Sequence, residues 1–141
     1  MKLSTHVAYN GNCEEAFNFY KSIFGGEFDT VQRNKDIPAE AASPVKADEQ
    51  DKILHISLPI GKNSMLMGCD MPAAFGEATR SNSFNISIST DSEADTERIY
   101  NGLLAGGKVN MPLDKTFWGA YFGMVVDKYG VQWMISYDYG Q

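Results

Sequence analysis

The first half of the chain shows a strand pattern followed by a helix pattern. Between Leu3 and Asn10, every second side chain falls on the same face, as in a β-strand. Asn12, with Glu15 three residues later, can cap a helix whose apolar stripe runs through residues 16–24. Gly25-Gly26 then ends the helix, because glycine accepts the left-handed conformation found at helix ends.

The second half repeats this order. Ser83–Ser89 alternates between apolar and polar positions, and Ser92 with Asp95 forms a second cap pair. Apolar residues again recur at helical spacing, and Gly106-Gly107 repeats the stop. Two copies are too few for a solenoid, so the repeat indicates a duplicated module.

Three further strand candidates follow each glycine stop. In the first half they are Glu27–Arg33, Ile53–Ile60 and Asn63–Cys69, and in the second half Lys108–Leu113, Phe117–Asp127 and Val131–Tyr137. The connection at 34–50 has room for one helical turn around Ala39–Ala42, and residues 71–82 divide the halves. We therefore predict an α+β protein, a single domain of two βαβββ modules at about 1–70 and 82–141.

Composition narrows the choice of partners and compartment. The 141 residues carry a formal net charge of −6 without a basic cluster, so we expect neither nucleic acid nor an anionic membrane as partner. The chain has no apolar run long enough for a signal peptide or a membrane span. Its two cysteines, Cys13 and Cys69, form no Cys-x-x-Cys motif and fit reduced thiols of a cytoplasmic protein.

Several stretches resemble PhnB-like proteins of the glyoxalase/bleomycin-resistance/dioxygenase (vicinal-oxygen-chelate) superfamily. They are Asn10–Phe17, Asp51–His55, Gly106–Leu113, Thr116–Gly119, Phe122–Val125, Asp127–Val131 and Trp133-Met134. The resemblance implies two modules forming a curved, mixed eight-stranded sheet, with the helices outside and a ligand cavity inside. It also implies a homodimer. Some PhnB-like proteins carry a demethylubiquinone methyltransferase label, but this chain has no Gly-x-Gly methyl-donor loop.

The resemblance also identifies where a metal would bind. Metal-using members place ligands on the first and last strands of each module, which here correspond to His6, a residue near Met65 or Met67, Asn85 and Met134. Only His6 is a good ligand, because the last-strand position usually holds Glu and a thioether cannot supply a hard oxygen. We therefore expect no metal cofactor, with a divalent metal as the alternative.

His55 is a second histidine with a functional interpretation. It lies on the face of its strand opposite Leu54, Ile56 and Leu58, so it faces the cavity if the helices cover those residues. His6 and His55 are then candidates for a general base near neutral pH. A hydrogen-bonded histidine that sets the shape of the cavity is the alternative for His55, and an ordinary strand-edge histidine is the alternative for His6.

Aromatic residues supply the remaining candidates. The alternation places Trp118 and Phe122 on one face of the predicted strand 117–127, with Phe117 and Tyr121 on the other. We predict a small-molecule cavity lined by His6, His55, Met67, Asn85, Trp118, Phe122 and Met134. The alternatives are a divalent-metal-dependent lyase, isomerase or dioxygenase, and a non-catalytic protein that sequesters a cationic, planar drug. Whether the protein is an enzyme stays open.

Overall fold

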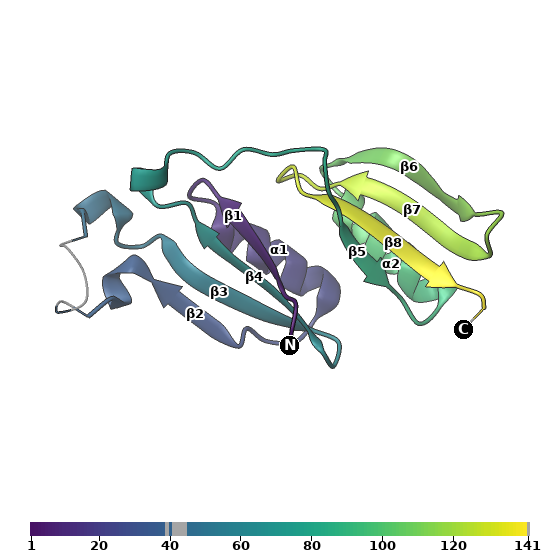
Figure 1. Ribbon diagram of the computed structural model, residues 1–141, viewed down its shortest axis with the longest axis horizontal. Helices are drawn as coiled ribbons and strands as arrows, with labels where there is room; N and C mark the ends of the chain where they lie inside the picture. Colours follow the sequence, from purple (N-terminus) through teal and green to yellow (C-terminus); the bar gives the residue numbers. More distant parts are fainter. Residues whose placement is uncertain (39, 41–44, 141) are drawn as a thin grey trace. The chain divides into compact units, whose positions relative to one another are not determined.

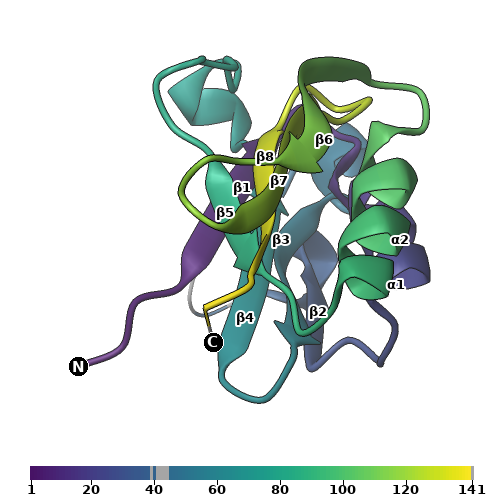
Figure 2. The ribbon, with the colours of Figure 1, turned by 90° about the vertical axis from the view of Figure 1, so that its right-hand side faces the viewer.

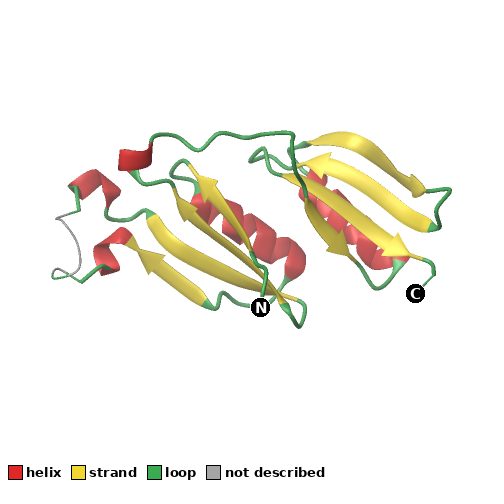
Figure 3. Cartoon of the chain, in the orientation of Figure 1, coloured by secondary structure: helices red, strands yellow, loops and turns green. Residues whose placement is uncertain are grey.

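A computed structural model describes residues 1–38, 40 and 45–140 of the chain. The chain divides into two compact units, Met1–Thr79 and Arg80–Gln141, and each contains four strands and one long helix (Figures 1 and 3). The helical turn expected around Ala39–Ala42 lies, apart from Glu40, outside the described residues.

The first unit follows the predicted order of elements. It contains β1 (Thr5–Tyr9), α1 (Cys13–Phe24), β2 (Thr30–Arg33), β3 (Ile53–Ile60) and β4 (Ser64–Asp70). Short 3₁₀ turns lie at Asn34–Asp36, Ala47–Glu49 and Ala73–Phe75. The sheet order is β1-β4-β3-β2, in which β1 and β4 run parallel and the other neighbours antiparallel.

The second unit repeats this topology. It contains β5 (Ile86–Ser89), α2 (Glu93–Leu104), β6 (Lys108–Lys115), β7 (Ala120–Val126) and β8 (Gln132–Asp138). The sheet order β5-β8-β7-β6 matches that of the first unit element by element. The predicted α+β class with two βαβββ modules is confirmed, and its strands form two four-stranded sheets.

One face of each sheet is covered by the helix of the same unit (Figure 2). In the first unit, Phe17 of α1 lies so close to Gly68 that a Cβ at this position would come within 2.6 Å of its ring. In the second, a Cβ on Gly123 would come within 2.6 Å of Tyr100 of α2. Gly68 and Gly123 therefore mark the helix-covered faces, and their immediate strand neighbours point to the opposite faces.

The two helices begin where the sequence predicted but are capped differently. Ser92 accepts a hydrogen bond from the backbone N–H of Asp95 at 3.1 Å, so the predicted role of Ser92 as the N-cap of α2 is confirmed. The side chain of Asn12 makes no capping hydrogen bond to α1. Asp70, at the end of β4, accepts from the backbone N–H of Cys13 instead. The predicted capping role of Asn12 is therefore wrong, although the start of the helix is right.

A second correction concerns the strand predicted at 117–127. The strand β7 begins only at Ala120, so Phe117 and Trp118 lie in the turn that joins it to β6. Gly119 adopts a φ of +91°, a left-handed conformation that favours glycine, and the backbone N–H of Thr116 donates to the carbonyl of Ala120. Within the described residues, no helix is long and apolar enough to cross a membrane.

Candidate functional site

The two histidines of the chain lie side by side on the helix-free face of the first sheet. Gly68 faces α1, so its neighbour Met67 points to the other face, and the register pairs Met67 with His6 of β1. Ile56 pairs with Gly68, which places His55 of β3 on that same helix-free face. The two imidazole rings stack with their centroids 6.0 Å apart and an interplanar angle of 20°.

This pairing changes the acid–base behaviour of His6. Desolvation of the ring, followed by the charge of His55, lowers the pKa of His6 from its ordinary value of 6.5. Both causes disfavour the imidazolium form of His6 and favour its neutral form. A neutral imidazole can accept a proton or bind a metal through a ring nitrogen.

The helix-free face of the second sheet carries a row of three methionines. Met124 of β7 is paired with Met111 of β6 on one side and with Met134 of β8 on the other. Gly123 faces α2, so Met124 and its row point to the opposite face. Ser87 of β5 continues the row beyond Met134. This face is soft and polarisable, a character typical of adaptable apolar surfaces.

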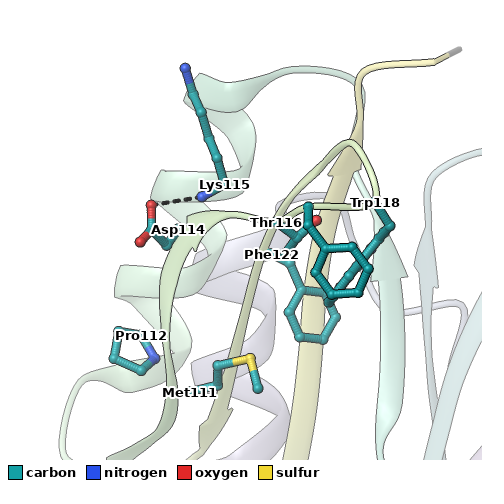
Figure 4. A pocket seen from close by; sticks show the side chains of 8 residues that line it. Met111, Pro112, Asp114, Lys115, Thr116, Trp118 and Phe122 are labelled. Atoms are coloured by element: carbon teal, nitrogen blue, oxygen red, sulfur yellow. Dashed lines mark hydrogen bonds between the residues drawn. The ribbon is translucent and has the colours of Figure 1, made fainter.

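A pocket of about 420 Å³ lies at one end of this face, where β6 turns into β7 (Figure 4). Its lining is mainly apolar and consists of Met111, Pro112, Asp114, Lys115, Thr116, Phe117, Trp118 and Phe122. The rings of Trp118 and Phe122 meet edge to face, with centroids 5.8 Å apart. Phe117 contacts Trp118 in the same manner, at 5.0 Å. The volume falls within the range of about 300–1,000 Å³ typical of small-molecule sites.

Most polar groups around this pocket already have a partner. The hydroxyl of Thr116 donates to the carbonyl of Ala120 and accepts from its backbone N–H, both at 3.1 Å. The ammonium of Lys115 lies 5.8 Å from the centre of the Tyr139 ring. The Asp114 carboxylate accepts from the backbone N–H of Lys115 at 2.8 Å (Figure 4). The apolar rings are therefore the part of the lining that a ligand can contact without displacing a hydrogen bond.

The structure places the predicted lining residues in two groups. His6, His55 and Met67 share one face of the first sheet, as derived above. Trp118 and Phe122 are brought together at the pocket, whereas Met134 lies along the sheet in the row that contains Met124. The pocket also contains residues that the sequence did not single out: Met111, Pro112, Asp114, Lys115 and Thr116. Four of them belong to β6 (Lys108–Lys115), where the sequence predicted a strand over Lys108–Leu113.

Asn85 lies just before β5, outside both groups. Its Oδ1 is buried and has no hydrogen-bond partner among the residues that the structure describes. A buried acceptor without a partner costs free energy, so its position calls for a donor. We expect a ligand or an ordered water to supply that donor.

A divalent metal held in the manner of the superfamily does not fit these side chains. Of the ligand positions carried over from the resemblance, His6 alone offers a good donor, and Met134 presents a thioether where a carboxylate is usual. Across residues 1–38, 40 and 45–140, no three His, Cys, Asp or Glu side chains cluster in a way that could hold an ion. These side chains therefore do not suit catalysis by a divalent metal.

Neither cysteine has the environment of a nucleophile. Cys13 occupies the first turn of α1 and is fully buried, and this burial, with the Asp70 carboxylate nearby, raises the pKa of its thiol far above the ordinary value. Burial likewise raises the pKa of Cys69. This geometry supports a structural role for both cysteines.

The chain matches known proteins along nearly its whole length. Residues 1–136 match the family described as 3-demethylubiquinone-9 3-methyltransferase. Protein YjdN of Escherichia coli is 30% identical over 142 residues, covering 96% of this chain and 95% of YjdN. The crystal structure of PA1353 from Pseudomonas aeruginosa is 38% identical, with a TM-score of 0.84 and 98% of each chain covered. A glyoxalase/bleomycin resistance protein from Albidiferax ferrireducens has the same fold at 15% identity, with a TM-score of 0.59 and coverage of 94% and 96%.

Proposed function

The chain belongs to the 3-demethylubiquinone-9 3-methyltransferase family, the PhnB-like branch of the vicinal-oxygen-chelate superfamily, and on this premise we propose that it binds a small aromatic molecule. The site is the pocket between β6 and β7, with Trp118 and Phe122 as the contact surface. The observation that carries this proposal is the edge-to-face pair of these rings beside an open, largely apolar pocket.

The exposure of the aromatic cluster supports a binding role. Trp118 keeps 57% and Phe117 98% of their surface exposed, although both are large and apolar. Contiguous exposed apolar surface of this kind marks sites that bind ligands or partners. A flat ring can stack on Trp118 or meet Phe122 edge-on, and such ring pairs contribute about 0.5–1.5 kcal/mol beyond burial alone. The free thioether of Met111 adds a sulfur–aromatic contact.

The proposal is tested by intrinsic tryptophan fluorescence. The chain has two tryptophans, and Trp133 is 1% exposed, so a soluble quencher reaches Trp118 far more readily. A ligand in the pocket protects Trp118 from the quencher and shifts its emission. In a Trp118→Phe variant only Trp133 fluoresces, and the same ligand leaves its emission unchanged. Protection of neither tryptophan by any member of a broad aromatic panel contradicts the proposal.

The charge of the ligand separates the sequestering alternative from the main proposal. The Asp114 carboxylate is the acidic group of the pocket, and the Lys115 ammonium lies over Tyr139. The panel should therefore hold neutral, cationic and anionic versions of one ring system. If the wild-type protein prefers the cationic compound, loses this preference in Asp114→Asn and shows no turnover, it is a protein that sequesters cationic compounds. Equal affinity for the neutral compound favours binding through ring contacts alone.

The catalytic alternatives need turnover assays alongside binding. Methyl transfer, the reaction in the family's description, requires a methyl donor that binds with measurable affinity. General-base chemistry requires His6 or His55, so its rate should fall in His6→Gln or His55→Gln. Ligand binding that persists in those variants without turnover supports the binding protein.

We also propose a homodimer in the cytoplasm that does not bind nucleic acid. The dimer rests on the family, and the absence of nucleic-acid binding rests on the net charge of −6. Light scattering gives the mass of the particle, and a mobility shift with duplex DNA at low salt tests the second expectation. A monomeric mass or a shifted DNA band contradicts the corresponding part.

A further inference from the structure

We propose that Asn10 is a modification site: its deamidation, which the native contacts slow, releases the segment that connects the two units. Asn10 lies in the turn between β1 and α1 and is followed by Gly11. This turn belongs to the first unit, whereas the aromatic pocket belongs to the second, so the proposal does not rest on the proposed function.

The side-chain amide of Asn10 holds the connecting segment at one residue. Its Nδ2 donates to the carbonyl of Ala78 at 2.8 Å, and its Oδ1 accepts from the backbone N–H of Ala78 at 2.7 Å. An asparagine amide presents donors and an acceptor side by side, so it can bind both backbone groups of one residue. Within residues 72–84, Ala78 is the one residue that is not exposed, which fits a segment fastened at this point.

Arg80, two residues later, is held by the second unit. Its Nε donates to the carbonyl of Tyr129 at 3.0 Å. Its aliphatic stem packs against Gly130, where a Cβ would lie 2.9 Å from the Cγ of Arg80. Ala78 and Arg80 thus make these contacts in different units, with Thr79 between them. Loss of the contact with Asn10 therefore frees the segment from the first unit while Arg80 stays bound to the second.

The sequence Asn10-Gly11 favours deamidation. Asparagine is a chemically labile side chain, and glycine has no side chain to hinder attack by its backbone nitrogen. This nitrogen attacks the Cγ of Asn10 and gives up its proton, while the bond from Cγ to Nδ2 breaks and the amide nitrogen leaves as ammonia. Water then opens the cyclic imide at either carbonyl carbon, which gives aspartate or isoaspartate. Water is the only other reactant.

The native structure restrains both reacting groups. Ala78 holds the amide of Asn10, and the backbone N–H of Gly11 donates to Oδ1 of Asp70 at 3.0 Å. The attacking nitrogen must lose its proton, and the neighbouring Asp70 carboxylate, which is 6% exposed, disfavours a second negative charge beside it. Deamidation therefore proceeds mainly from states in which these contacts are open.

The modified side chain no longer matches Ala78. The new carboxylate keeps an acceptor for the backbone N–H of Ala78 but has no N–H to donate to its carbonyl. An anionic oxygen then faces the carbonyl oxygen and repels it, so the segment around Ala78 separates from the turn. The isoaspartyl product also lengthens the main chain just before Gly11, whose N–H meets Asp70.

The first test compares Asn10→Asp, which carries the deamidated side chain, with the wild type in limited digestion by trypsin. Trypsin cuts after Arg80 when the segment around it extends into the protease. We expect the fragments 1–80 and 81–141 to form about three to ten times faster in Asn10→Asp. Asn101→Asp, in the second Asn-Gly pair of the chain, adds the same charge at an exposed site of α2 and should leave this rate unchanged.

Two measurements on the wild-type protein need no variant. Mass spectrometry of tryptic peptides follows deamidation at mildly alkaline pH, and Asn10 should react about fivefold more slowly in the folded protein than in urea. Amide hydrogen exchange follows the contact itself. The backbone N–H of Ala78 should exchange more slowly than that of Thr79, because it donates to Asn10.

Three results would overturn the proposal. The first is an Asn10 that deamidates equally fast in the folded and the unfolded protein, or in neither. The second is cleavage after Arg80 that is unchanged in Asn10→Asp, or that rises equally in Asn101→Asp, since equal effects indicate general destabilisation. The third is a backbone N–H of Ala78 that exchanges as fast as that of Thr79.

Discussion

The carboxylate of Asp70 accepts a hydrogen bond from the backbone N–H of Cys13 at 3.0 Å, so the last residue of β4 caps the first turn of α1. The same oxygen accepts from Gly11, and the second oxygen accepts from Ile53 at 2.8 Å. One buried side chain thereby joins the start of the helix to the start of β3. The negative charge also stands at the positive end of the helix dipole.

Replacing Asp70 by Asn should destabilise the protein by about 1–3 kcal/mol, because an amide offers one acceptor oxygen where three N–H groups now donate. The free energy of unfolding, obtained by urea titration of the wild type and the variant, measures this loss of stability. Asn12→Ala is the matched control and should change it by less than about 0.5 kcal/mol, since Asn12 makes no side-chain cap. Equal losses in the two variants would contradict the assignment of the cap to Asp70.

Acid should destabilise the fold through His6. The folded protein lowers the pKa of His6 below the ordinary 6.5, so the unfolded chain binds this proton more readily. The contribution of His6 is therefore present above pH about 6.5 and is lost as the pH falls through the lower folded pKa. Urea titrations at pH 7.5 and 5 should show a smaller loss of stability in His6→Gln than in the wild type.

A proton NMR titration of the two imidazoles provides the control for this prediction. His6 should titrate below 6.5 in the wild type and should move toward its ordinary value in His55→Gln, because one of the two causes of the shift is removed. A His6 pKa at or above 6.5, or a His6 pKa that does not change in His55→Gln, would contradict the interaction between the two stacked rings.

The thiols should be unreactive in the native protein. Cys13 is fully buried with a raised pKa, so a disulfide reagent at pH 7 should modify it only after unfolding. Half-buried Cys69 should react slowly, since its pKa is also raised. The Cys69→Ser variant isolates Cys13, and rapid modification of that variant in the absence of denaturant would show that the first turn of α1 is accessible.

Much of the fold could be predicted because its signals are local. Ile53–Ile60 was predicted with its observed ends, since alternation and the following Gly61 define that strand. The cap of α1 could not be predicted, because Asp70 and Cys13 are far apart in the sequence and meet only when β4 pairs with β1. Local patterning identified the start of the helix but not the group that caps it.

In the candidate site, too, local features could be predicted from the sequence, whereas contacts between distant strands could not. The opposite faces of His55 and Ile56 followed from strand alternation, but the stacking of His6 on His55 depends on how β1, β4 and β3 pair. Trp118 was misplaced because alternation in 117–127 continued through Gly119, where the chain in fact turns. The turn brings Phe117 and Trp118 to the pocket, but four other lining residues lie on β6, where strand alternation alone does not show which side chains line a pocket.

The central claim, a small-molecule site beside Trp118, is tested most directly by NMR of protein labelled at the methionine methyl groups. The seven methionines report on both units, and Met111 lines the pocket whereas Met65 lies in the first unit. An aromatic ligand found by fluorescence should shift the Met111 methyl and the indole N–H of Trp118, with Met65 unchanged. Shifts confined to Met65 and Met67, with Met111 and Trp118 unmoved, would place the ligand elsewhere and contradict the account.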